Sequence, residues 1–72
     1  MAMKEYVSNK VQTFRGDAGI TQEELAERVG VSRQTIIAIE RGNYTPSVLL
    51  ALRIARAFSA PLEKVFFITY EK

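Results

Sequence analysis

The chain has 72 residues, which is enough for one domain with a small core. Its formal net charge is +2 at pH 7 and its pI is near 9.2, which gives only a weak preference for acidic partners. It contains no cysteine or histidine, so disulfides, thiol chemistry and the usual zinc ligands are excluded. The longest apolar run, Val48–Leu52, is far shorter than the roughly 20 residues that span a bilayer, so we expect no contact with a membrane. We also expect a cytoplasmic protein that binds no cofactor and no metal.

The first elements expected are a short strand over residues 3–7, which are rich in aromatic and β-branched side chains, and a helix from Asn9 to Ala18. Ser8 can cap this helix by accepting hydrogen bonds from its first amides, and Gly19 would end it. Its buried stripe would comprise Val11, Phe14 and Ala18.

Residues 21–42 carry the most specific pattern in the chain, that of two short helices joined by a tight turn. Thr21 and Glu24 have the spacing of a capping box, so a helix begins there. Gly30 ends it because glycine tolerates a positive φ, and Ser32 caps the second helix, residues 32–41, which stops at Gly42. The apolar residues fall in helix-turn-helix register: Leu25, Val29, Val31, Ile36 and Ile39.

The second of these helices would present a reading surface to the major groove of DNA. Its outward positions are Arg33, Gln34, Ile37, Ala38 and Arg41. Arginine can donate two hydrogen bonds to guanine, glutamine can pair with adenine, and an exposed aliphatic group can contact a thymine methyl. A merely solvated polar face is the alternative, and the helix-turn-helix register favours DNA reading.

Two scaffold helices should follow. Thr45 would cap a fourth helix with Pro46 at its first position, and a fifth would run from Pro61 to about Phe66 with Leu62 and Val65 facing inward. The core stripe of the fourth helix would comprise Val48, Ala51, Ile54, Ala55 and Phe58, which leaves Leu49 and Leu52 beyond what that stripe requires.

Residues 67–70 have strand character, like residues 3–7, so the two ends of the chain are expected to form an antiparallel ribbon. An isolated ribbon of two strands is marginal in water, and a second copy of the chain would supply a surface for it to pack on. The alternative is that residues 66–70 close the core of the monomer. The expected dimer interface comprises Leu62, Phe66, Phe67, Ile68 and Tyr70.

From about Asn9 to Phe66 the chain resembles the XRE family, the lambda-repressor-like helix-turn-helix proteins. The segment SRQTIIAIERGNYTPS is similar to the family's signature from the recognition helix to the fourth helix. The resemblance implies an all-α, five-helix domain over residues 1–72 with a small β-ribbon. It also implies a homodimeric regulator of the cytolysin-repressor type, a repressor that binds double-stranded DNA at an inverted repeat.

Individual roles follow from the same resemblance. The residues at base-contacting positions are Ser32, Arg33, Gln34, Ile37, Ala38 and Arg41. Those at phosphate-contacting positions are Gln22, Asn43, Tyr44 and Ser47, although Asn43 and Tyr44 could instead simply fill a turn. Arg15 and Glu40 occupy positions where many members form a buried ion pair between the first and third helices.

Two residues depart from the family pattern. Gly16 stands where members usually carry a polar or charged residue, and it should weaken the first helix by up to about 1 kcal/mol relative to alanine. Ile37 replaces a small polar residue, so an isoleucine exposed there either touches DNA or has no obvious use.

No enzyme is expected from this sequence. It has no catalytic constellation and no phosphate-binding glycine loop, and the acidic cluster Glu23, Glu24 and Glu27 is typical of a solvated helix face. A second hypothesis keeps the same fold as a protein-interaction module, for example an antitoxin-like partner. This hypothesis would be favoured if the apolar surface exposed by Leu49, Leu52 and Phe67 were too extensive for one dimer interface to cover.

Overall fold

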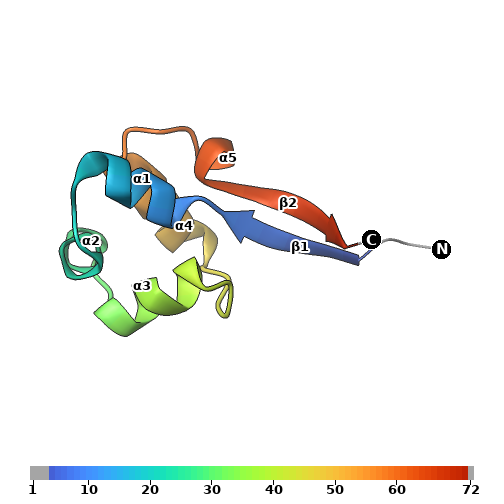
Figure 1. Ribbon diagram of the computed structural model, residues 1–72, viewed down its shortest axis with the longest axis horizontal. Helices are drawn as coiled ribbons and strands as arrows, with labels where there is room; N and C mark the ends of the chain where they lie inside the picture. Colours follow the sequence, from blue (N-terminus) through green and yellow to red (C-terminus); the bar gives the residue numbers. More distant parts are fainter. Residues whose placement is uncertain (1–3, 72) are drawn as a thin grey trace.

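The structure is a computed structural model that describes residues 4–71. Its elements are, in chain order, β1 (Lys4–Asn9), α1 (Val11–Ala18), α2 (Gln22–Val29), α3 (Arg33–Glu40), α4 (Val48–Ala57), α5 (Leu62–Val65) and β2 (Phe66–Glu71). The helices pack into one body, and the two strands extend from it as a ribbon (Figure 1). The five helices and the ribbon are confirmed, but "all-α" is imprecise because the terminal strands form a sheet. No helix within residues 4–71 is long and apolar enough to cross a membrane.

The core lies where the helices meet. Its most deeply buried side chains are Val11, Leu25, Ile36, Ile39, Ile54 and Val65. Burying a side chain of this size contributes roughly 1.5–3 kcal/mol, so this cluster is the main source of stability in so short a chain. Ala26 is also buried, and its small side chain lets α2 approach α3 and α4 closely.

The chain enters α1 later than the sequence suggested, and Ser8 is not a helix cap. Ser8 lies in β1, where its Oγ accepts a hydrogen bond from Thr69 Oγ1 at 2.6 Å across the ribbon. Lys10 is the N-cap of α1 but makes no capping hydrogen bond with its side chain, and Asn9, one residue earlier, accepts through Oδ1 a hydrogen bond from the Val11 amide at 3.1 Å. Ala18, the last residue of α1, is exposed, so its expected place in the buried stripe was wrong. Met3, expected in the first strand, lies outside the described residues.

The start of α4 also differs from the expectation. Ser47, not Thr45, is the N-cap, because its Oγ accepts a hydrogen bond from the Leu50 amide at 3.1 Å. Thr45 and Pro46 precede the helix. With this start Leu50 is buried, at 7% exposure, whereas Val48 is 71% exposed. The expectation that Val48 belongs to the core was therefore wrong.

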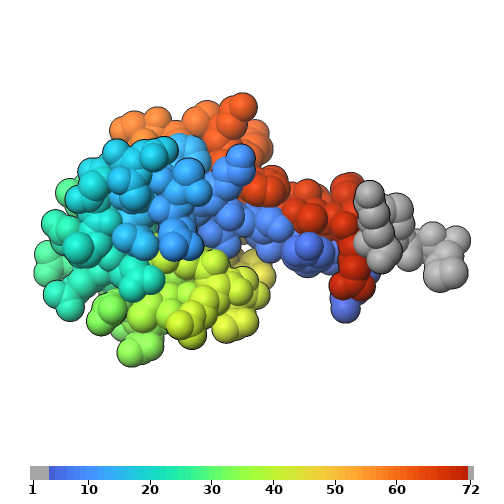
Figure 2. Space-filling model, viewed as in Figure 1, coloured from blue at the N-terminus to red at the C-terminus, as the bar shows by residue number. Residues whose placement is uncertain are grey.

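The ribbon is antiparallel, with Val7 opposite Ile68 and Asn9 opposite Phe66. Phe66, at the base of β2, is only 8% exposed and closes the core of the single chain, so it offers little surface to a partner. Farther out, Ile68 is 58% exposed. The ribbon projects beyond the helical body (Figure 2), and the described chain measures 42 × 22 × 21 Å along its principal axes.

Candidate nucleic-acid interface

Local hydrogen bonds and one glycine in residues 21–32 fix the start of α2 and the turn that orients α3. The Thr21 amide donates to Glu24 Oε1 at 2.8 Å while the Glu24 amide donates to Thr21 Oγ1 at 3.0 Å, which completes the capping box of α2. The hydrogen bond from the Thr21 amide stabilises the ionised carboxylate and lowers the pKa of Glu24. Gly30 ends α2 with φ 77°, and Ser32 caps α3 by accepting from the Thr35 amide at 3.2 Å.

The inner face of α3 fixes which residues point outward. Ile36 and Ile39 are completely buried, and the exposed residues on α3 and at its C-cap include Arg33, Gln34 and Arg41. Ile37 and Ala38 are half-buried. Ile37 is therefore not the fully exposed isoleucine that the helical register suggested.

Three side chains join α1 and α2 to the end of α3. Arg15 Nε lies 2.7 Å from Glu40 Oε2, and Arg15 Nη2 donates to Glu40 Oε1 at 3.3 Å. Gln22 Nε2 donates to the same Oε1 at 3.0 Å. The Glu40 carboxylate is only 4% exposed, and its hydrogen bond raises the pKa of Arg15 above the ordinary value. This network holds α3 against α1 and α2.

A polar cleft lies beside this network, between α1 and α3. It is lined by Gln12, Gln22, Arg33, Ile37, Glu40 and Arg41. Gln12 was absent from the expected site, although a signal for it existed. Gln12 lies one turn before Arg15 on α1, and residues one turn apart lie on the same face of a helix. The expected contact between Arg15 and Glu40 therefore also predicts that Gln12 faces α3.

The loop after α3 holds the remaining expected contacts. Asn43 and Tyr44 are exposed, and the Asn43 amide donates to the Ala38 carbonyl at 2.9 Å, which folds the loop back on α3. Ser47 is exposed at the start of α4, where its oxygen accepts from the Leu50 amide. Its hydroxyl hydrogen can still donate to a phosphate.

The expected acidic cluster on α2 does not form a metal site. No group of three or more histidine, cysteine, aspartate or glutamate side chains within residues 4–71 is placed to hold a metal ion. Glu24 instead serves as the capping partner of Thr21.

The fold and the placement of α3 are those of helix-turn-helix proteins, and the family match and the relatives given next place the chain among regulators of transcription, a class that binds DNA and is not enzymatic. The helix-turn-helix family model matches residues 11–65, and the chain belongs to this XRE-type family. It is 52% identical to the uncharacterized HTH-type transcriptional regulator YgzD of Bacillus subtilis over 65 residues, which are 90% of this chain and 98% of that protein.

Further comparisons agree with this assignment. The chain is 56% identical to an uncharacterized HTH-type transcriptional regulator of Methanothermobacter thermautotrophicus, covering 81% of this chain and 86% of that one. Among solved structures it is similar to the restriction-modification controller protein C.AhdI of Aeromonas hydrophila. That likeness has a TM-score of 0.71 and 28% identity, and it covers 75% of this chain and 82% of the other.

Proposed function

We propose that residues 1–72 act as one domain, a homodimeric transcription repressor that binds an inverted-repeat operator in the cytoplasm. Each chain places α3 in the major groove of one half-site. The twofold axis of the dimer coincides with that of the operator, so the two reading helices lie about one DNA turn, or roughly 34 Å, apart.

The exposure of Arg33 and Gln34 at the start of α3 carries this proposal. Both side chains lie on the half of the helix that enters the groove first, and both can form paired hydrogen bonds with base edges. Ile36 and Ile39 hold the opposite face in the core. The groove-facing side chains are thus presented by a helix that cannot rotate without breaking the core.

Side chains around α3 would position it on the DNA backbone. Gln22 lies at the first turn of α2, where amides without a partner inside the helix attract phosphate. Asn43, Tyr44 and Ser47 lie beyond the other end of α3. Contacts at both ends would fix the register of the helix in the groove and carry no sequence information themselves.

Ile37 and Ala38 would supply the apolar part of the readout. Ile37 lines the polar cleft together with Gln12 and Arg41, and its side chain is half-buried, so part of it stays accessible. The thymine C5-methyl is the apolar group on the major-groove edge, so we expect a thymine in each half-site opposite Ile37.

Selection of bound duplexes from a random pool tests the proposal. The purified chain should enrich an inverted repeat whose half-site centres are about 10–10.5 base pairs apart, or a multiple of that. Enrichment of asymmetric sites, or of no sequence, would contradict dimeric reading. Placed over a promoter, the selected site should lower reporter transcription when the protein is expressed, and a rise would contradict repression.

A further inference from the structure

Gly16 lies inside α1 at a position where the fold itself has no need of a glycine. Its backbone is helical and lacks the positive φ that glycine permits at Gly19, the C-cap. A Cβ added at Gly16 would lie in open space, with nothing from the rest of the described chain within 4 Å. Glycine weakens a helix relative to alanine, and its remaining use is to let another molecule approach the backbone closely.

Gly16 lies on the side of α1 that borders two polar clefts. Residues at i, i+4 and i+7 share one face of a helix, so Gln12, Gly16 and Gly19 form one exposed line, which we call the α1 face. Gln12 lines the polar cleft between α1 and α3. Gly19 lines a second cleft, and both clefts have Gln22 and Arg33 in their walls. Gly16 therefore lies between two clefts of the proposed DNA-reading surface.

The charges around these clefts suit an anionic partner. The Glu40 carboxylate is paired with Arg15, at 2.7 Å from Nε to Oε2. The other charged side chains that line the clefts are Arg33, Arg41 and Glu23, which are two positive charges and one negative charge. The clefts at the two ends of the α1 face therefore attract a phosphate group more than they repel it.

Gln12 offers a hydrogen-bond donor to such a group. Gln22 already donates through Nε2 to the Glu40 carboxylate at 3.0 Å. Gln12 is exposed in the same cleft, and its amide nitrogen has two hydrogens to donate. Phosphate and sugar oxygens receive half or more of the hydrogen bonds between proteins and DNA, so a backbone phosphate is the partner that this donor fits.

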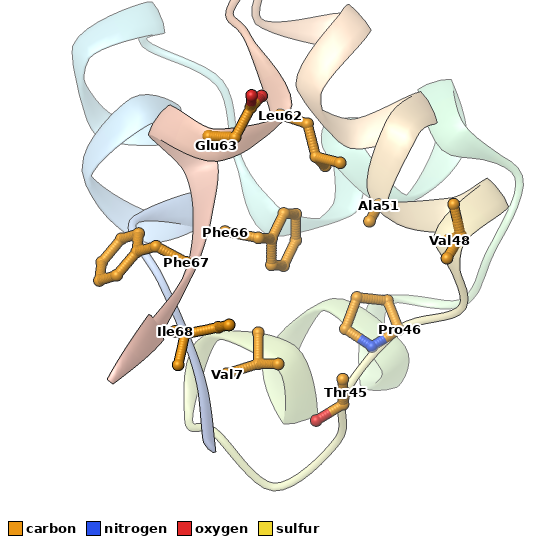
Figure 3. A pocket seen from close by; sticks show the side chains of 10 residues that line it. All are labelled: Val7, Thr45, Pro46, Val48, Ala51, Leu62, Glu63, Phe66, Phe67 and Ile68. Carbon is orange, nitrogen blue, oxygen red and sulfur yellow. The ribbon is translucent and has the colours of Figure 1, made fainter. Parts of the chain in front are cut away.

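The α1 face does not overlap with the apolar groove at the base of the ribbon (Figure 3). That groove is lined by side chains of the ribbon, α4 and α5, among them Val7, Val48 and Phe66. Neither Gln12 nor Gly16 lines it. Covering the groove therefore leaves the α1 face accessible to DNA.

We propose that one strand of the operator crosses the α1 face, where Gln12 donates through Nε2 to a backbone phosphate and Gly16 lets the sugar-phosphate chain approach the helix. This inference rests on the DNA binding of the proposed function and adds α1 to the contact surface. Gln12 carries no sequence information in this role, because every nucleotide presents the same phosphate.

Substitutions at Gly16 separate stability from binding. Gly16→Ala and Gly16→Leu should each raise the midpoint of thermal unfolding by roughly 4 °C, because both residues favour a helix more than glycine does. Both should weaken binding to the selected operator, and the bulk of leucine should do so by roughly 10-fold or more. Thr13→Leu is the matched control, since Thr13 is exposed on α1 and lines neither cleft. It should bind the operator like wild type.

Charge changes at position 12 test the phosphate contact. Gln12→Lys should tighten binding and steepen the slope of log affinity against log salt by roughly 0.9 for each chain bound, because one more phosphate is neutralised. Gln12→Glu should weaken binding to the operator and to a scrambled duplex by equal factors. Thr13→Lys adds the same charge outside the α1 face and should change the slope much less. A slope that Gln12→Lys leaves unchanged would contradict the contact.

Methylphosphonate substitution locates the contact on the DNA. Replacing each operator phosphate in turn by the uncharged methylphosphonate should reveal one position per half-site where wild type loses affinity and Gln12→Ala does not. Identical responses of the two proteins at every position, or operator binding by Gly16→Leu as tight as that of wild type, would overturn the proposal and leave base reading by α3 to its own test. A wild-type chain that binds no duplex would contradict DNA binding itself and this proposal with it.

Discussion

Arg15 on α1 and Glu40 at the end of α3 lie 2.7 Å apart, from Nε to Oε2, and Gln22 of α2 donates to the same carboxylate. One buried acidic group thereby connects the three helices that frame the proposed DNA-reading surface. An ion pair of this kind fixes how elements meet, and its net contribution to stability is small because both charges lose solvation.

Removing one partner of this pair should be costly. Glu40→Ala leaves the Arg15 guanidinium mostly buried without its counter-charge, so the free energy of unfolding should fall by roughly 3 kcal/mol in urea denaturation. The double variant Arg15→Met with Glu40→Leu should stay within about 1 kcal/mol of wild type, because neither charge remains. A double variant as unstable as Glu40→Ala would show that the pair itself supplies the stability.

The N-cap of α4 can be located by alanine substitution. Ser47→Ala removes the acceptor for the Leu50 amide and should cost about 1 kcal/mol of unfolding free energy. Thr45→Ala should change it by less than about 0.5 kcal/mol, since Thr45 lies before the helix. Equal losses in the two thermal unfolding curves would be inconsistent with a helix that begins at Val48.

The capping box of α2 should make stability depend on pH. The hydrogen bond from the Thr21 amide lowers the pKa of Glu24 in the folded chain. This contribution is fully present above the unfolded pKa, about 4.3, and is lost as the pH falls through the lower folded value. Glu24→Gln keeps a capping group but does not titrate.

The difference in unfolding free energy between wild type and Glu24→Gln should therefore favour wild type near pH 7 and shrink toward pH 3. Comparing the two proteins cancels the other carboxyl groups. A difference that is constant across this range would mean that the carboxylate charge has no part in the cap.

The elements that local chemistry specifies were predictable from the sequence. The start of α2 follows from Thr21, and the turn between α2 and α3 follows from Gly30 and Ser32, each of which acts within a few residues of its own position. The ribbon strands were also expected, although both are longer than the sequence suggested: β1 runs to Asn9, and β2 begins at Phe66.

Elements with competing local signals were not predictable. Thr45 and Ser47 can both cap a helix, and Pro46 between them suits a first helical position. In the structure the helix starts at Val48, and Leu50, not Val48, lies in the core. The partial burial of the Ile37 side chain could not be predicted from the sequence either, because it depends on how closely α1 packs against α3 in the folded chain.

Ile37 offers a test of apolar readout. Ile37→Ser should weaken binding to the selected operator by about 1 kcal/mol, the worth of one methyl-sized contact. Replacing the candidate thymine with uracil removes the methyl but keeps the pairing, so wild type should weaken on that duplex while Ile37→Ser responds little. Equal responses of both proteins at every thymine would show that Ile37 does not read DNA.

Reading of base edges by α3 can be measured as the affinity of Arg33→Ala for the selected operator and for a scrambled duplex of the same length at one salt concentration. Loss of a paired contact with guanine should cost roughly 1–3 kcal/mol on the operator, relax the preference at one base pair per half-site, and change binding to the scrambled duplex far less. Equal losses on the two duplexes would make Arg33 a phosphate contact and would contradict base reading by α3.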